Sequence, residues 1–76
     1  MIGELTNVIL KCDLPEKRLT AGDVGTVVLV HQGGKGFEVE FVTLNGETLA
    51  VVTLLKNQVR AIKRHEIAHA RELASA

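Results

Sequence analysis

The sequence predicts a mainly β fold, with five short strands followed by a C-terminal α-helix. Residues 1–62 contain several segments rich in β-branched residues, all seven glycines and one Asn-Gly pair. This combination is typical of short strands joined by tight turns. From Lys63 onward the chain has no Gly or Pro and is rich in Ala, Glu and Arg, which favours a helix.

The strand segments each show a β-branched or alternating pattern and end at a turn signal. They cover residues 8–12, 24–30, 37–41, 47–54 and 59–62. Pro15 follows the first strand and ends it because it cannot donate to a ladder. Asn45-Gly46 predicts a hairpin turn, since both residues tolerate positive φ. Residues 55–58 predict a single helical turn, and the C-terminal helix is expected to reach about Leu73.

These connections predict a small, strongly bent barrel of the SH3-like kind over residues 1–62, with the helix at 63–76 in the same domain. Gly25 is expected at a bulge or bend of this barrel. The second and fourth strands are apolar at nearly every position, so one apolar set must point outward. We expect this set to be an interface formed by Val27, Leu29, Val52 and Leu54.

Residues 65–69, His-Glu-Ile-Ala-His, fit the H-E-x-x-H pattern in which two His share a zinc and the Glu is a general base. A catalytic site also needs a third protein ligand and a cleft, but only seven residues follow His69. On a helix, His65, His69 and Glu72 would share a solvent-facing arc. We therefore expect no catalytic or metal site, and at most adventitious binding of an ion by these three residues. Zinc binding by this helix is the remote alternative.

Other features of the sequence exclude further classes of function. The glycine-rich stretch at 33–36 lacks phosphate-loop spacing and precedes a strand, so it predicts a turn. Cys12 is the only cysteine and cannot form an internal disulfide, and the chain starts without the pattern of a secretory leader. No apolar run approaches the roughly 20 residues of a membrane span. We expect a cytoplasmic protein with no cofactor and no membrane contact.

Charge is balanced overall but not along the chain. Residues 1–50 carry four basic and seven acidic side chains, whereas residues 51–76 carry five basic and two acidic ones. A basic tail can bind nucleic acid, but the acidic body has no Trp or Tyr on which bases could stack. The same lack of aromatic residues argues against Pro-rich peptides and methyl-lysine as ligands. We expect the tail to lie on an acidic body, its own or a neighbour's.

Several segments together resemble a family of small, mostly bacterial proteins catalogued as domain of unknown function 4926. They are residues 13–16, Leu19, 21–28, 37–41 and 48–54. The resemblance spans roughly residues 5–62. It implies an SH3-like barrel and brings no activity and no catalytic residues. The H-E-x-x-H segment lies outside it.

The sequence therefore predicts a non-catalytic protein–protein interaction module, which binds itself as a homo-oligomer or binds a protein partner. The alternative is a nucleic-acid-binding accessory protein, because residues 21–28 are similar to the start of KOW-type barrels. Its basic contacts would be Lys56, Arg60, Lys63, Arg64 and Arg71.

Overall fold

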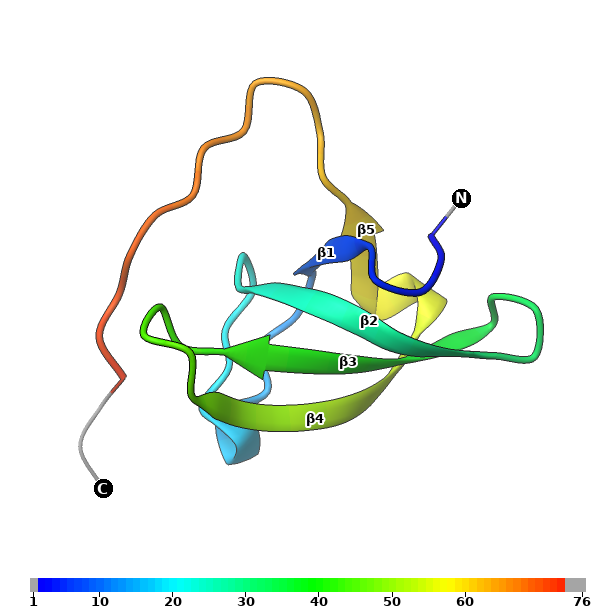
Figure 1. Ribbon diagram of the computed structural model, residues 1–76, viewed down its shortest axis with the longest axis horizontal. Helices are drawn as coiled ribbons and strands as arrows, with labels where there is room; N and C mark the ends of the chain where they lie inside the picture. Colours follow the sequence, from blue (N-terminus) through cyan, green and yellow to red (C-terminus); the bar gives the residue numbers. More distant parts are fainter. Residues whose placement is uncertain (1, 74–76) are drawn as a thin grey trace.

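The computed structural model describes residues 2–73, which form one sheet of five antiparallel strands and contain no α-helix (Figure 1). The strands are β1 (Asn7–Leu10), β2 (Val24–His31), β3 (Gly36–Val42), β4 (Thr48–Leu55) and β5 (Val59–Ala61). Two 3-10 turns, η1 (Pro15–Lys17) and η2 (Lys56–Gln58), precede β2 and β5. The predicted mainly β fold and the helical turn before the last strand are confirmed.

The sheet has the order β4-β3-β2-β1-β5, so β4 and β5 lie at its two edges. The expectation of a closed barrel is therefore wrong. All three residues of β5 pair with β1, in the register Val8↔Ala61 to Leu10↔Val59. The chain leaves β4 through η2 and turns away to reach β1, and the two edges do not meet.

The core fills the inner face of the bent sheet. It draws on every strand and on Leu19, from the long loop that follows β1. Phe37, Val39 and Phe41 of β3 point into it, and the alternating Glu38 and Glu40 point outward, as the period of two predicts. The buried cluster consists of Val8, Leu10, Leu19, Val27, Phe37, Val39, Phe41, Leu54 and Val59.

Two of the four predicted interface residues lie in this core. Val27 is 0% exposed and Leu54 is 1% exposed, and Val52 packs partly buried against the cluster. The expected outward orientation is wrong for β2 because a bulge between Val27 and Leu29 reverses the alternation along the strand. It is wrong for β4 because Val52 and Leu54 lie opposite the inward Val39 and Phe37. Leu29 alone points outward, at 44% exposure.

Gly25 and Gly46 have different structural roles. Gly46 has φ +94° in the turn between β3 and β4, which confirms the prediction from Asn45-Gly46. Gly25 does not form the bulge of β2; it is buried opposite Val8, where the side chains of Val39 and Phe41 leave no room for a Cβ atom. The strand therefore needs glycine at position 25 for close packing.

The predicted C-terminal helix is not formed. Residues 62–73 run as an extended, mostly exposed segment that arches away from the sheet and returns beside it, and we call this segment the tail (Figure 1). His65 has φ +68°, a conformation that interrupts any helix. Residues 74–76, the rest of the predicted helix, lie outside the described residues. Within residues 2–73, no helix has the length and hydrophobicity of a membrane span.

Candidate protein-interaction surfaces

The outer face of the sheet is the face that carries Glu38 and Glu40. Side chains opposite one another in an antiparallel pair share a face, so Leu29 and Thr53 flank Glu38, while Thr26 and Val51 flank Glu40. Val51 and Leu55 of β4 are among the exposed large apolar residues. The outer face is therefore an apolar surface interrupted by carboxylates.

Glu38 is the centre of a polar cluster on this face. Its Oε2 lies 2.6 Å from Nε2 of His31, and the hydroxyl of Thr53 donates to both of its oxygens, at 2.9 and 2.8 Å. The hydrogen bond from His31, followed by that from Thr53, holds the pKa of the Glu38 carboxyl below its usual value. The carboxylate is thus ionised at neutral pH and bound to its strand neighbours. Glu38 is therefore the hydrogen-bond partner of His31 in this structure.

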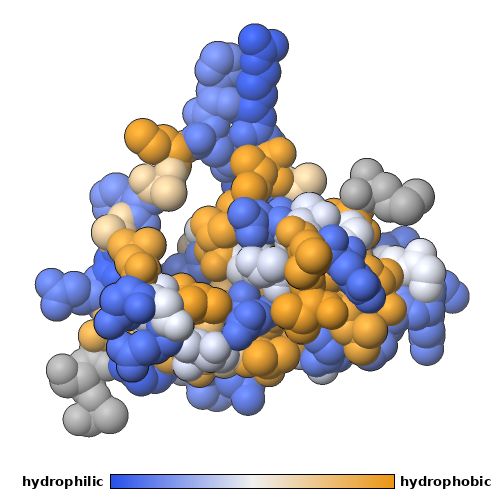
Figure 2. All heavy atoms as spheres, in the orientation of Figure 1, coloured by the Kyte–Doolittle hydropathy of each residue, from blue (hydrophilic) through white to orange (hydrophobic). Residues whose placement is uncertain are grey.

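The tail arches over one end of the outer face and leaves a groove of about 1070 Å³. Val24, Val42 and Leu44 contribute apolar lining on the body side, and Ile62 and Ile67 contribute it from the tail. Ile67 is 93% exposed. Figure 2 shows the tail standing off the body, with hydrophilic residues at the top of the arch. The apolar residues of the tail therefore do not seal the face beneath them.

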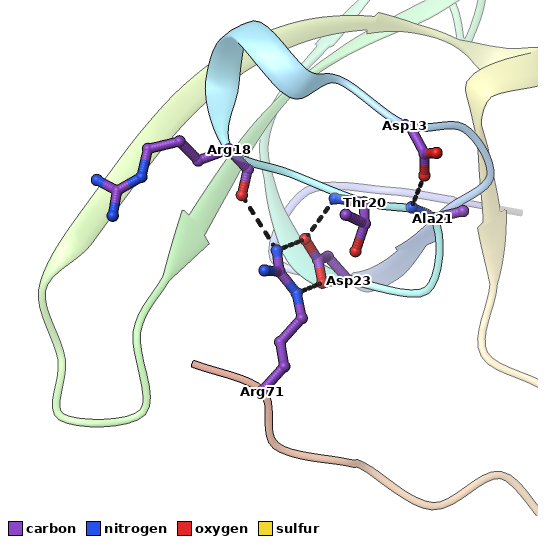
Figure 3. A network of polar contacts seen from close by, with 6 residues as sticks. All are labelled: Asp13, Arg18, Thr20, Ala21, Asp23 and Arg71. Atoms are coloured by element: carbon purple, nitrogen blue, oxygen red, sulfur yellow. Dashed lines mark hydrogen bonds and ion pairs between the residues drawn. The ribbon is translucent and has the colours of Figure 1, made fainter. Parts of the chain in front are cut away.

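One anchor of the tail is a bidentate ion pair between Arg71 and Asp23 (Figure 3). Nε of Arg71 donates to Oδ1 at 2.9 Å and Nη2 donates to Oδ2 at 2.5 Å, and Nη2 also donates to the carbonyl of Arg18 at 3.1 Å. The backbone N–H of Thr20 donates to the same carboxylate at 2.9 Å. We call this contact the latch.

The latch changes the acidity of Asp23. Partial burial raises the pKa of the Asp23 carboxyl, but the hydrogen bonds from Arg71 and from the Thr20 backbone together outweigh burial, and the pKa lies below its ordinary value. A neighbouring loop contact, from the N–H of Ala21 to Oδ1 of Asp13 at 2.8 Å, holds the segment that presents Asp23 (Figure 3).

A second anchor lies where the tail leaves β5. Arg60 donates two hydrogen bonds to Glu66, at 2.9 and 2.7 Å, and the backbone N–H of Lys63 donates to the same carboxylate. The hydrogen bond from Arg60, followed by that from Lys63, lowers the pKa of Glu66 to about 2. The two anchors hold the tail at both ends and leave its middle free of the sheet.

The structure does not bring the H-E-x-x-H residues together as a helix would. His65, His69 and Glu72 are exposed on the extended tail, so the predicted common arc does not exist. No group of three His, Cys, Asp or Glu side chains within residues 2–73 is arranged to hold a metal ion. Glu66, which the pattern casts as a general base, is instead bound to Arg60.

Neither ion pair, Arg71 with Asp23 or Arg60 with Glu66, was predicted from the sequence. The available signal was the opposite charge of the body and the tail, which predicted that the tail would lie on an acidic surface. Arg71 and Asp23 meet in this way, although they are 48 residues apart in the chain. The sequence could not identify Asp23 as the partner of Arg71, because it predicted a helix for this segment and the extended tail follows a different path.

Comparison with known proteins gives one finding. No curated protein and no solved structure matches the chain significantly. A family model described as Domain of unknown function (DUF4926) matches residues 4–61. This match includes all five strands and ends before the tail. The chain therefore belongs to the family Domain of unknown function (DUF4926).

Proposed function

We propose that this chain is a non-catalytic protein–protein interaction module of the bacterial cytoplasm, and that the outer face of its sheet binds a second copy or another protein. The observation that carries the proposal is the exposure of large apolar side chains along β2 and β4 on a small domain. Exposed apolar patches on small domains often mark the sites at which they bind other proteins. The residues concerned are Val28, Leu29, Val51 and Leu55.

The position of the tail supports this proposal. The latch fixes Arg71 at Asp23, next to the start of β2, and the groove lies over the same end of the sheet. Leu29 and Leu55, at the other end of their strands, do not line that groove. A partner can therefore reach the outer face without displacing the tail.

The architecture supports an SH3-like assignment as part of the same proposal. Three consecutive strands form a meander, β2-β3-β4, and the last strand returns to pair with the first. A 3-10 turn separates the last two strands, and a long loop joins the first two. This order and these connections are similar to those of SH3-like domains, a fold that hosts many unrelated functions. The similarity therefore supports the fold assignment, and the function rests on the exposed apolar side chains.

The same structure weakens the case for nucleic acid as the partner. Arg60 and Arg71, two of the five basic side chains assigned to that role, are bound to Glu66 and Asp23. Phe37 and Phe41 are each 2% exposed and cannot stack on bases. Protein binding is therefore the better-supported function.

Sedimentation equilibrium over low to high micromolar concentrations tests the self-associating form of this proposal. A contact between copies through the outer face predicts that the wild type associates and that Leu29→Glu stays monomeric, because a carboxylate would be buried in that interface. Leu5→Glu is the matched control: Leu5 is also exposed but lies outside the sheet, before β1. A wild type that remains monomeric throughout would overturn self-association.

Titration of labelled DNA and RNA at low salt tests the choice of partner. We expect no binding tighter than micromolar. Tight binding that weakens steeply as salt rises would show that phosphates are contacted, and it would overturn the proposal in favour of a nucleic-acid role.

A further inference from the structure

The free edge of β4 has the features of a pairing edge. β4 is an edge strand of eight residues, and no charged residue or proline occurs between Thr48 and Leu55. Figure 1 shows it at the margin of the sheet, with β3 as its neighbour. Natural edge strands are usually protected by charge, proline or shortness, because an open ladder invites another strand. β4 has none of these protections.

The hydrogen-bond pattern identifies which backbone groups of β4 are open. Lys56 donates its N–H to the carbonyl of Lys35, and Leu55 lies opposite Gly36. In an antiparallel ladder, hydrogen-bonded pairs alternate with non-hydrogen-bonded pairs. Leu54 and Val52 therefore bond to β3, whereas Val51, Thr53 and Leu55 direct their N–H groups away from it.

The N–H of Leu55 confirms this alternation, because it donates to the side chain of Gln58 at 2.8 Å instead of to β3. That contact also occupies the donor of Leu55. The open donors in this part of the edge are the N–H groups of Val51 and Thr53, two residues apart. A strand laid against β4 can bond to both of them.

We infer that β4 pairs antiparallel with β4 of a second copy of this chain, with Val51 of one copy opposite Thr53 of the other. This inference rests on the self-association in the proposed function, and it places the contact between copies at the edge of β4 instead of on the outer face. In this register both open residues of each copy form hydrogen-bonded pairs, and Val52 lies on the two-fold axis. The sheet becomes a continuous ten-stranded sheet across the two copies.

Charge at the ends of β4 selects the antiparallel direction. Glu47 precedes the strand and Lys56 follows it. Antiparallel pairing places Glu47 of one copy beside Lys56 of the other, at both ends of the interface, whereas parallel pairing would bring like charges together. The neutral strand between them lets the two backbones approach without burying a charge.

Amide hydrogen exchange followed by NMR tests the pairing on the unmodified protein. We expect the amides of Val51 and Thr53 to exchange at least about tenfold more slowly in concentrated than in dilute protein, because pairing would protect them. The amides of Val52 and Leu54 should be protected equally at both concentrations, since they bond within the chain. These neighbours are internal controls.

The variant Val51→Pro gives an independent test by sedimentation equilibrium. Proline keeps an apolar side chain on the outer face but removes the N–H that points to the open edge, which an edge strand tolerates. We expect association to be lost in Val51→Pro and kept in Val51→Thr, the matched control with the N–H intact. An NMR spectrum with the wild-type dispersion of core methyl signals establishes that each variant is folded.

The outcomes separate this inference from the proposed function. If the wild type associates while Val51 and Thr53 exchange equally fast at both concentrations, edge pairing is wrong, and the outer face remains the interface. The same conclusion follows if folded Val51→Pro associates and Leu29→Glu does not. If the wild type stays monomeric, both edge pairing and self-association are overturned.

Discussion

Gly25 shows how one residue constrains the packing of the inner face. A Cβ atom at this position would lie 2.5 Å from Cγ1 of Val39 and 2.9 Å from Cε1 of Phe41. Both neighbours are buried core side chains of β3, which cannot move without opening the core. The glycine-containing pattern of β2 indicated a special position, but only the structure shows that the reason is close packing.

We expect Gly25→Ala to lower the free energy of unfolding by about 1–3 kcal/mol, the range for overpacking a well-filled core. Gly3→Ala is the control, because Gly3 has no heavy atom within 4 Å of the added Cβ and no positive φ. Urea denaturation followed by circular dichroism measures both. Equal midpoints for the two variants would show that the core around Gly25 is loose.

Strands could be located from the sequence more accurately than they could be oriented. The predicted segments at 24–30, 37–41 and 47–54 differ from β2, β3 and β4 by at most one residue at each end. Orientation failed where alternation carried no information, because β2 and β4 are apolar on both faces. In β2 the bulge also reversed which residues point into the core. No residue pattern in this valine-rich segment indicates where a bulge lies.

Adjacent residues of β4 test the observed orientation. Leu54 is in the core and Leu55 is exposed on the outer face. We expect Leu54→Ala to lower the free energy of unfolding by about 2–5 kcal/mol, as for other buried Leu residues. We expect Leu55→Ala to change it by about 0.5 kcal/mol or less. Chemical denaturation of both variants decides, and the reverse ranking would mean that β4 is shifted by one residue.

The tail was predicted as a helix from its composition, and composition was a weak guide here. A segment of this length is marginal as an isolated helix and needs an apolar face to pack. Ile67 and Leu73 are the only large apolar side chains after Lys63. The ion pairs of Glu66 with Arg60 and of Arg71 with Asp23 instead fix the segment in an extended path.

The latch should depend on pH. Because the pKa of folded Asp23 lies below its ordinary value of 3.8, the ion pair stabilises the held tail above that value, and this stabilisation is lost as the pH falls through the lowered pKa. We expect ¹⁵N relaxation of residues 68–73 to show increased motion on acidification below about pH 4.

The variant Arg71→Ala is the control for this pH dependence. Its tail should already be mobile at neutral pH, and acidification through the Asp23 titration should produce no further release. If the tail of the wild type is equally mobile at neutral and acidic pH, the latch does not hold the tail in solution.

The whole molecule divides into a body that carries the fold and a tail that does not. The buried cluster lies entirely between Val8 and Val59, and the family model ends at residue 61. The sequence indicated this division by the change in composition and charge near residue 62. It could not show the path of the tail, because the tail is held by two ion pairs, Arg60 with Glu66 and Arg71 with Asp23, and not by packing in the core.

A chain ending at Ile62 should therefore fold like the full chain. Removing residues 63–76 takes no member of the buried cluster. It removes the latch, a partly exposed ion pair worth about 1 kcal/mol or less, and the solvent-exposed contact of Glu66 with Arg60. We expect the free energy of unfolding in urea to fall by no more than about that amount, with an unchanged core in the NMR spectrum. Because Val51, Thr53 and Leu29 all remain, the shortened chain should also self-associate as the full chain does. A shortened chain that is unfolded would show that the tail stabilises the sheet through contacts beyond the two anchors.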